Sequence, residues 1–406
     1  MMAGRQCVIL VGGRGTRLGA LTQNCPKPLL AVGGRPFVSY LIQEAARHGF
    51  RRILLLAGFK AESFADELAA LHKHAPGNVE LSIVTEPVPL GTAGALKFAA
   101  ARLDTHFLLL NGDSIFDVNL LDLAAPPFPA GIIGRLALKP EQDTARYGTV
   151  AFEDGYVRKF IEKNPASEPG LINGGVYWLS RQIVAHIADG FVSLENDVLP
   201  KLATGGHLQG TVYDRFMLDI GLPDTLQQAQ SGVPARMHRP AVFFDRDGVL
   251  NKDVGYAHRS DQIVWIDGAI AAVKTFNDAG YYVFVVTNQA GVARGLYAEA
   301  DVQALHFWMN DELARSGGHI DAFMYCPHHP QGTVAKYTRA SQHRKPAPGM
   351  IVDLLNAWPI VRDRSFLIGD KDTDIAAAEA AGVRGYLYKG GNMANFARKC
   401  AGMREL

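Results

Sequence analysis

Short apolar runs recur along the chain, and each is followed by a glycine or a turn and then by a helix-like segment. Parallel strands that are covered by helices on both faces typically have such uninterrupted apolar sequences. The clearest runs are Cys7–Val11, Ile53–Ala57, Phe107–Leu110, Val242–Phe244, Tyr282–Val286 and Phe366–Ile368. This alternation of strand and helix predicts α/β domains.

The pattern is interrupted once, in the middle of the chain. A helix-like stretch after Pro223 runs out at Ser231-Gly232, two prolines bracket a short polar link, and a new strand begins at Ala241. A chain of 406 residues is long enough for two or three domains. We therefore predict a first domain at 1–230, a linker at 231–240 and a second domain at 241–406.

Composition and charge narrow the class of protein. Hydrophobic residues make up 48% of the chain and the formal net charge is +1, so nothing drives the whole protein toward nucleic acid or a membrane. The four cysteines (Cys7, Cys25, Cys326 and Cys400) form no CxxC pair. With no signal peptide and no apolar run of the roughly 18–20 residues that span a membrane, we expect a cytoplasmic protein. The sequence carries no signal of oligomeric state.

Four motifs in the first domain carry phosphate chemistry. Glycines in the loop Gly12–Leu18 allow backbone N–H groups to approach a phosphate, and Cys25–Leu30 holds Lys27 between two stiffening prolines. Asp113 and Asp219 each follow an apolar run, where α/β sheets bind ligands and two carboxylates can share Mg²⁺. Taken singly, the loop could be a tight turn and the aspartates could be helix caps.

Together these motifs resemble the sugar-1-phosphate nucleotidyltransferase family over nearly all of residues 5–230. The resemblance implies a Rossmann-like (GT-A-like) domain in which a sugar 1-phosphate attacks the α-phosphate of an NTP and releases pyrophosphate. It implies a triphosphate site, catalytic charge stabilisation by Arg17 and Lys27, and Mg²⁺ on Asp113 and Asp219. The implied triphosphate ligands are Gly12, Gly13, Gly15, Thr16 and Arg17.

Further segments of the first domain extend this resemblance toward the nucleoside and the sugar. Leu90–Gly94, with Gly91 and Thr92, resembles the segment that lines the nucleoside. Phe160–Lys163 and Ile172–Gly175 resemble the sugar-phosphate pocket. The resemblance implies that Glu162 and Asn173 bind hydroxyls and that Lys163 binds phosphate.

The second domain opens with the strongest short motif of the chain. Val242–Val249 is an apolar strand that ends in Asp245 and Asp247, two residues apart, followed by glycine. One carboxylate can attack phosphorus while the other is the general acid and base. An Asp-rich turn is the alternative, and a calcium loop fails because no glutamate follows in the EF-hand position.

Three later pieces fit a phosphatase and complete a second resemblance. Thr287 and Asn288 end a strand with groups able to hold phosphate, Arg344-Lys345 supplies cations, and Leu367–Asp374 supplies acids for Mg²⁺. Their order resembles the haloacid-dehalogenase (HAD) superfamily across 241–390. It implies a doubly wound parallel sheet with Asp245 as nucleophile, Asp247 as acid and base, Thr287 and Lys345 on phosphate, and Mg²⁺ on Asp245, Asp370 and the backbone carbonyl of Asp247.

A narrower match is to the branch of heptose-1,7-bisphosphate 7-phosphatases and histidinol phosphatases. It rests on Asp245–Asn251, Gly255-Tyr256, Thr287–Gly295, Tyr325–Pro330 and Gly369–Lys371. In that resemblance Arg294 and Arg344 bind the distal phosphate of the substrate. The branch usually holds zinc through three cysteines and one histidine.

The zinc ligands of that branch are only partly present. Cys326 and His328 match, but Ser341-Gln342-His343 replaces the Cys-x-Cys pair, and serine is a poor zinc ligand. At most Cys326, His328 and His343 remain, so we expect substoichiometric zinc.

Joined, the two resemblances predict one pathway. The phosphatase would remove the 7-phosphate of D-glycero-D-manno-heptose 1,7-bisphosphate, and the transferase would activate the resulting 1-phosphate. Glu86 before Leu90-Gly91-Thr92 resembles heptose-1-phosphate guanylyltransferases and favours GTP over other NTPs. Two alternatives stay open: another sugar phosphate, such as a hexose or N-acetyl sugar, with a different NTP, or one catalytically inactive, regulatory domain. Retention of Asp113, Asp219, Asp245, Asp247 and Asp370 argues against the latter.

Overall fold

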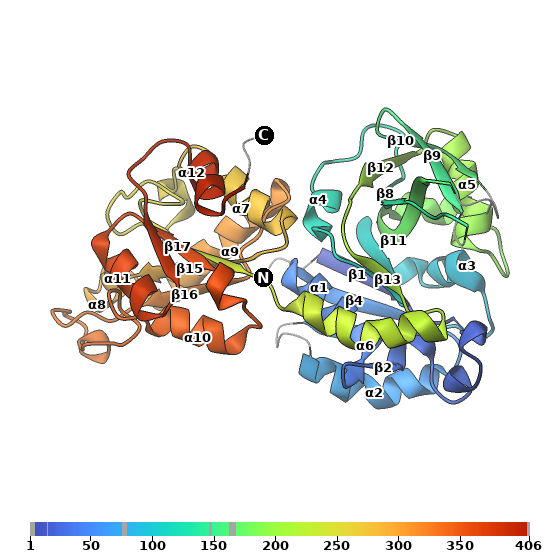
Figure 1. Ribbon diagram of the computed structural model, residues 1–406, viewed down its shortest axis with the longest axis horizontal. Coiled ribbons are helices and arrows are strands. Elements are labelled where there is room, and N and C mark those ends of the chain that lie inside the picture. The colour runs from blue at the N-terminus through green and yellow to red at the C-terminus, as the bar shows by residue number, and fades with distance from the viewer. Residues whose placement is uncertain (1–4, 14, 75–78, 146–147, 162–167, 404–406) are drawn as a thin grey trace. The chain divides into compact units, whose positions relative to one another are not determined.

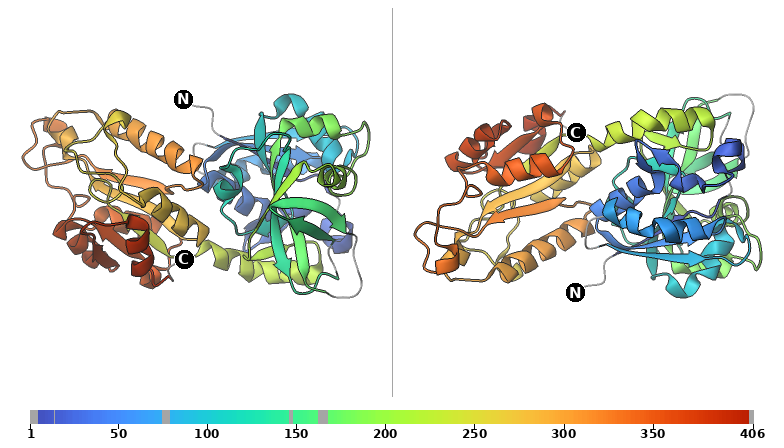
Figure 2. Two further views of the ribbon diagram at one scale, coloured as in Figure 1. Left: turned by 90° about the horizontal axis from the view of Figure 1, so that it is seen from above. Right: turned by 90° about the horizontal axis from the view of Figure 1, so that it is seen from below.

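The computed structural model describes residues 5–13, 15–74, 79–145, 148–161 and 168–403. The chain divides into two compact units, Met1–Arg236 and Met237–Leu406, and each is described by itself. Figures 1 and 2 show that strands and helices alternate through both units. Among the helices of these described residues, none is long and apolar enough to span a membrane.

A nine-stranded sheet forms the centre of the first unit, with the order β5-β4-β1-β6-β11-β8-β12-β10-β9. The strands are β1 (Arg5–Leu10), β4 (Phe50–Ala57), β5 (Glu80–Thr85), β6 (His106–Asn111), β8 (Gly134–Glu141), β9 (Thr149–Glu153), β10 (Tyr156–Ile161), β11 (Gly170–Ser180) and β12 (Leu208–Val212). Strands β5, β4, β1 and β6 are parallel, as predicted, whereas β11 runs antiparallel to both β6 and β8. The predicted parallel strands are therefore confirmed, but the sheet as a whole is mixed.

Helices and short strands complete the first unit. They are α1 (Phe37–Arg47), α2 (Ala61–His74), α3 (Gly91–Phe98), α4 (Leu120–Ala124), α5 (Leu199–Thr204) and α6 (Pro223–Met237), with paired strands β2 (Ala31–Val32) and β3 (Arg35–Pro36), and β7 (Ser114–Phe116) and β13 (Met217–Asp219). Leu96 of α3 and Leu202 of α5 are buried in one apolar cluster with Leu109 and Tyr177 of the sheet. Burial of such side chains contributes about 1.5–3 kcal/mol each.

Helix α6 differs from the sequence-based prediction. It continues through Ser231-Gly232 to Met237, so the first seven residues of the predicted linker 231–240 are helical. Ala229, Val233 and Met237 are all buried, and their spacing of four residues keeps one apolar stripe facing the core. Such packing offsets the roughly 1 kcal/mol that a glycine costs inside a helix.

The second unit is a five-stranded parallel sheet with the order β16-β15-β14-β17-β18. Its strands are β14 (Ala241–Phe244), β15 (Tyr282–Asn288), β16 (Ala322–Cys326), β17 (Phe366–Gly369) and β18 (Arg384–Leu387), and its helices are α7 (Ala269–Asp278), α8 (Ala290–Ala293), α9 (Glu299–Arg315), α10 (Gly349–Ala357), α11 (Asp372–Ala380) and α12 (Met393–Cys400). Helices α7 and α12 cover one face of the sheet, and α10 and α11 cover the other. The predicted doubly wound sheet is confirmed.

Candidate active sites

In the first unit the glycine-rich loop follows β1 directly. The register aligns Leu10 with Asn111 of β6, and the N–H of Gly112 donates to the carbonyl of Leu10, so the loop lies beside the turn that carries Asp113. Gly15 has a φ of 63°, and a Cβ at Gly12 would lie 3.0 Å from the backbone nitrogen of Gly58. Both positions therefore require glycine.

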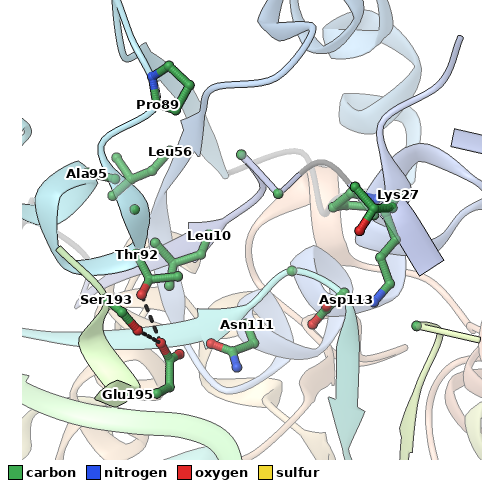
Figure 3. A pocket seen from close by; sticks show the side chains of 18 of the residues that line it. Leu10, Lys27, Leu56, Pro89, Thr92, Ala95, Asn111, Asp113, Ser193 and Glu195 are labelled. Carbon is green, nitrogen blue, oxygen red and sulfur yellow. Dashed lines mark hydrogen bonds and ion pairs between the residues drawn. The ribbon is translucent and has the colours of Figure 1, made fainter. Parts of the chain in front are cut away.

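A cavity of about 630 Å³ opens over these strand ends. It is lined by these predicted site residues: Gly12, Gly13, Gly15, Thr16, Arg17, Lys27, Gly91, Thr92 and Asp113. Figure 3 shows Lys27 and Asp113 together on one side, with Thr92 and Glu195 on the other and Asn111 between them. The structure thus gathers residues from four separate sequence motifs around one cavity.

Lys27 lies between the two aspartates that were predicted to bind Mg²⁺. Its Nζ is 2.7 Å from Oδ2 of Asp113 and 3.8 Å from Oδ1 of Asp219. The lysine side chain is 7% exposed, whereas those of Asp113 and Asp219 are 39% and 23% exposed. The carboxylates therefore keep access to solvent, and their oxygen donors suit a hydrated divalent cation.

Glu195 is a cavity residue that sequence reasoning missed. Its Oε2 accepts hydrogen bonds from Oγ1 of Thr92 at 2.8 Å and from Oγ of Ser193 at 3.3 Å (Figure 3). Thr92 in turn accepts from the N–H of Leu194 at 2.7 Å. No apolar run or glycine-rich turn precedes Glu195, so nothing in its local sequence indicated a site.

Of the three predicted sugar ligands, the structure describes only Asn173. The side chain of Asn173 bonds within its own strand: Nδ2 donates to the Tyr177 hydroxyl at 2.8 Å, and Oδ1 accepts from the N–H of Gly175 at 3.1 Å. Glu162 and Lys163 lie outside the described residues. The sugar contacts of all three residues stay predictions.

Glu86 lines the same cavity and contacts the segment predicted to line the nucleoside. Its Oε2 accepts from the N–H of Leu90 at 3.3 Å, and burial raises the pKa of its carboxyl. A Cβ at Gly58 would collide with Oε1 of Glu86, so glycine at 58 makes room for this carboxylate.

In the second unit the predicted residues meet at the carboxyl ends of the central strands. Asp245 follows β14, Thr287 ends β15, and Asp370 follows β17. Strand β14 lies between β15 and β17, where the strand order reverses and α/β sheets bind ligands. A cavity of about 540 Å³ is lined there by Asp245, Asp247, Thr287, Asn288, Arg294, Arg344 and Lys345.

Lys345 is the buried cation of this second cavity. Its Nζ lies 2.9 Å from Oδ1 of Asp245 and 2.7 Å from Oδ1 of Asp374, and it donates to the carbonyl of Val286 at 2.8 Å. Burial raises the pKa of Asp245 to about 6, and the charge of Lys345 acts in the opposite direction. The lysine therefore favours the ionised form that a nucleophile needs.

Asp374 also completes a set of carboxylates that could hold a metal ion. Oxygens of Asp245, Asp370 and Asp374 all lie within 4.8 Å of one another. Oδ1 of Asp370 is buried without a hydrogen-bond partner, so a cation would satisfy it. These three oxygen donors fit Mg²⁺. The sequence motif included Asp374 but gave it no role; its position four residues after Asp370 was the available signal.

Arg246, between the two aspartates of the motif, is fully buried. Its Nη2 donates to Oδ2 of Asp247 at 2.9 Å, to the carbonyl of Ala257 at 2.7 Å and to Gln289 at 3.2 Å. Burial and the charge of Arg246 hold the pKa of His306 well below its usual value, so the neutral ring can accept from Nη1 at 3.3 Å. Arg246 therefore fixes the carboxylate of Asp247.

Two arginines and a histidine also line the phosphatase cavity. They are Arg294, Arg344 and His329. Burial and the charge of Arg294 lower the pKa of Arg344, while burial and then Arg344 and Arg294 lower the pKa of His329. These shifts agree with the position of all three side chains in one cavity lining. His329 was not among the predicted site residues.

The candidate zinc ligands have other partners. Sγ of Cys326 contacts the carbonyl of His328, and Nε2 of His343 lies 2.8 Å from Oδ2 of Asp353. Throughout the described ranges, the cluster of Asp245, Asp370 and Asp374 is the only group of three or more His, Cys, Asp or Glu donors within 4.8 Å. Zinc occupancy stays a prediction.

Comparison with known proteins assigns both units. The nucleotidyl transferase family matches residues 6–236, and the HAD-hydrolase-like family matches residues 342–399. A D-glycero-beta-D-manno-heptose-1,7-bisphosphate 7-phosphatase of Rhodopseudomonas palustris is 49% identical over 161 residues, which cover 40% of this chain and 89% of that protein. The corresponding enzyme of Escherichia coli K12 is 43% identical over 144 residues, covering 36% and 75%.

A solved structure resembles the first unit. HddC from Yersinia pseudotuberculosis, in complex with GMP-PN, has a TM-score of 0.50 and 29% identity, covering 56% of this chain and 99% of that one. The chain therefore belongs to the nucleotidyl transferase family and carries a HAD-like phosphatase domain after its transferase domain, which makes it an enzyme with nucleotidyltransferase and phosphomonoesterase activities.

Proposed function

We propose that the second unit hydrolyses the 7-phosphate of D-glycero-D-manno-heptose 1,7-bisphosphate and that the first unit transfers GMP from GTP to the heptose 1-phosphate. The relatives of the second unit act on that bisphosphate by name, and HddC was solved with a guanine nucleotide analogue. The order is chemically consistent, because the phosphatase makes the acceptor that the transferase needs.

The observation that carries the phosphatase assignment is the presence of two cationic groups in one cavity. Lys345 contacts the proposed nucleophile Asp245, whereas Arg294 and Arg344 line the same cavity and, in the described part of the chain, form no ion pair with Asp245. A monophosphate ester would use only the first group. A bisphosphate would use both, since its second phosphate needs a partner and arginine matches phosphate oxygens bidentately.

In the proposed hydrolysis, a carboxylate oxygen of Asp245 attacks phosphorus and the bond from phosphorus to the sugar oxygen breaks. Asp247 protonates that leaving oxygen, then takes a proton from the water that hydrolyses the phosphoaspartate. Thr287, Asn288 and Lys345 hold the phosphate oxygens during both steps.

In the proposed transfer, an oxygen of the heptose 1-phosphate attacks the α-phosphorus and the bond to pyrophosphate breaks. The glycine-rich loop, with Thr16 and Arg17, positions the triphosphate, and Lys27 offsets charge at the α-phosphate. Mg²⁺, held by Asp113 and Asp219 here and by Asp245, Asp370 and Asp374 in the phosphatase, would neutralise phosphate charge.

Glu86 supports guanine as the base. A carboxylate only accepts hydrogen bonds when ionised, and guanine presents adjacent N–H donors to such a group. We therefore expect GTP to exceed other NTPs in kcat/KM, and Glu86→Gln to reduce that preference while Glu80→Gln, on the exposed start of β5, leaves it unchanged. An unchanged preference in Glu86→Gln would remove this residue from base selection.

One assay tests the whole proposal. The protein is incubated with heptose 1,7-bisphosphate and each NTP in turn, and phosphate and pyrophosphate are measured separately. We expect phosphate release with every NTP and pyrophosphate release chiefly with GTP, only after phosphate has appeared. Faster turnover of a hexose or N-acetyl sugar phosphate would favour the alternative substrates. Pyrophosphate without phosphate, or the reverse, would indicate one inactive domain.

The four cysteines are free, and two of them are buried. Free thiols persist in a reducing compartment, which supports a cytoplasmic location for both reactions.

A further inference from the structure

The segment 327–345 brings three side chains to the phosphatase cavity but has little regular structure. It lies between β16 and α10, contains one 3-10 turn at Ala335–Tyr337, and contributes His329, Arg344 and Lys345 to the cavity lining. The positive charges of Arg344 and Arg294 repel one another. Contacts outside the cavity help to keep the segment in place.

A carboxylate on α9 supplies those contacts. Oε1 of Glu299 accepts a hydrogen bond from the Tyr337 hydroxyl at 2.6 Å, and Oε2 accepts from the Tyr325 hydroxyl at 3.0 Å. Gln303, one helical turn later, donates to the same Tyr325 oxygen at 3.0 Å. These bonds lower the pKa of Glu299, with the Tyr337 bond contributing most. Hydrogen bonds to an ionised acceptor are roughly twice as strong as neutral ones.

Backbone bonds carry this restraint to the cavity. The carbonyl of Tyr337 accepts a hydrogen bond from the N–H of His329 at 3.2 Å. Tyr337 is therefore bound to Glu299 through its hydroxyl and to His329, which lines the cavity, through its backbone. The N–H groups of Thr333 and Val334 donate to the carbonyl of Ala293 at 2.8 and 3.0 Å, directly before Arg294. Both tyrosine rings pack against Val292 and Tyr297.

We infer that Glu299 is a positioning residue for substrate selection: it anchors Tyr325 and Tyr337 so that segment 327–345 presents Arg344 and His329, beside Arg294, to the distal phosphate of a sugar bisphosphate. The inference rests on the proposed bisphosphate substrate. Lys345, at the end of the segment, is held separately by Asp245, Asp374 and the carbonyl of Val286, so we expect the chemical step itself not to depend on Glu299.

The test compares a bisphosphate with a monophosphate in two variants. Tyr337→Phe removes one hydroxyl and keeps the ring, and Glu299→Ala removes both acceptor oxygens. We expect each variant to raise KM for heptose 1,7-bisphosphate about 10-fold with kcat nearly unchanged. The contact with the distal phosphate is the same in the bound substrate and in the transition state, so its loss weakens binding without slowing the chemical step. The kcat/KM for p-nitrophenyl phosphate should stay within about 2-fold of the parent value, because this substrate has no second phosphate to contact Arg294 and Arg344. Glu299→Gln, which still accepts one bond, should recover part of the loss.

Two control variants separate this inference from the proposed function. Glu312 lies near the other end of α9 and pairs with Arg315. Glu312→Ala should therefore leave kcat/KM unchanged for both substrates. If a bisphosphate is bound as proposed, Arg344→Ala should lower kcat/KM for heptose 1,7-bisphosphate much more than for p-nitrophenyl phosphate. If only Arg344→Ala shows this selective loss and Glu299→Ala does not, the positioning role of Glu299 is wrong. If Arg344→Ala affects both substrates equally, the proposed bisphosphate substrate itself is wrong.

Hydrogen exchange supplies a readout that does not depend on activity. Amides of His329, Thr333 and Val334 should exchange faster in Glu299→Ala and Tyr337→Phe, while amides of β14 and β15 stay protected. Unchanged exchange in segment 327–345, or equally faster exchange throughout the second unit, would contradict the inference.

Discussion

Each unit contains a lysine between two aspartates, and the two clusters differ in how far solvent reaches them. Lys345 lies 2.9 and 2.7 Å from Asp245 and Asp374, whose side chains are 8% and 1% exposed. Lys27 lies 2.7 and 3.8 Å from Asp113 and Asp219, whose side chains are 39% and 23% exposed. One lysine and two aspartates thus form a closed cluster in the phosphatase and an open one in the transferase.

This difference matches the chemistry of each unit. In the phosphatase one aspartate is the proposed nucleophile, so a tightly held lysine keeps it oriented and ionised in a dry site. In the proposed transfer neither aspartate bonds to phosphorus, and the more exposed carboxylates of Asp113 and Asp219 are accessible to a hydrated cation. A buried ion pair is costly to break because the remaining charge has no compensation, whereas an exposed pair contributes little.

The largest expected effect tests whether the two clusters work independently. Asp245→Asn should lower phosphate release by at least about 10⁴-fold, as loss of a nucleophile does, and leave nucleotidyl transfer from pre-made sugar 1-phosphate unchanged. Asp261→Asn, on an exposed turn, is the matched control. Loss of both activities in a folded Asp245→Asn protein would contradict two separate sites.

Replacing each lysine with methionine sharpens the comparison directly. Lys345→Met should lower the free energy of unfolding by about 3–5 kcal/mol, because two buried carboxylates lose their counter-charge. Lys27→Met should lower it by less than about 1 kcal/mol but reduce the rate of transfer roughly 10²–10³-fold. Denaturant unfolding and steady-state rates measure both quantities. Equal losses of stability would mean that burial does not distinguish the clusters.

The closed cluster shares its cavity with Arg294 and Arg344, and Arg294→Ala tests what these two cations bind. We expect kcat/KM for heptose 1,7-bisphosphate to fall roughly 10- to 150-fold, the cost of one charge-assisted contact, with little change for p-nitrophenyl phosphate. Similar losses on both substrates would instead assign Arg294 to the reacting phosphate or to the fold.

The smallest expected net change concerns metals, because Mg²⁺ should restore the activity that chelation removes. Chelation should stop both reactions, and Mg²⁺ alone should restore both to about their starting rates, since all five carboxylates offer oxygen donors that suit Mg²⁺. Elemental analysis should find zinc well below one ion per chain. A tightly bound zinc at unit stoichiometry would contradict this and make Cys326, His328 and His343 the candidate ligands.

Much of this organisation could be predicted from the sequence, for a physical reason. Parallel strands buried on both faces must be uniformly apolar, so β1, β6, β14 and β17 were visible together with the polar residues after them. The antiparallel strand β11 was not recognised, because glycines and an asparagine interrupt its apolar pattern. Helix α6 was predicted too short, because tertiary packing of Val233 and Met237 outweighs the local effect of Gly232.

Site residues that act only through contacts with residues far away in the sequence could not be predicted. Glu195 reaches Thr92 from about a hundred positions later in the chain, and Glu299 meets Tyr337 across a loop. Neither belongs to a motif with a fixed spacing. Lys27 and Lys345, by contrast, were identified because each stands beside proline in a short motif that carries charge.

The buried Arg246 also offers a spectroscopic probe of the phosphatase reaction. Its Nε–H donates to both carboxylate oxygens of Asp247 at 3.2 Å, and the guanidinium is shielded from bulk water. Guanidinium protons that water cannot reach exchange slowly, so the ¹⁵N-bound proton of Arg246 should give a persistent NMR resonance among rapidly exchanging arginines. When Asp247 turns from the guanidinium toward a leaving oxygen, that resonance should shift, and the general acid could be followed in solution without labelling the substrate.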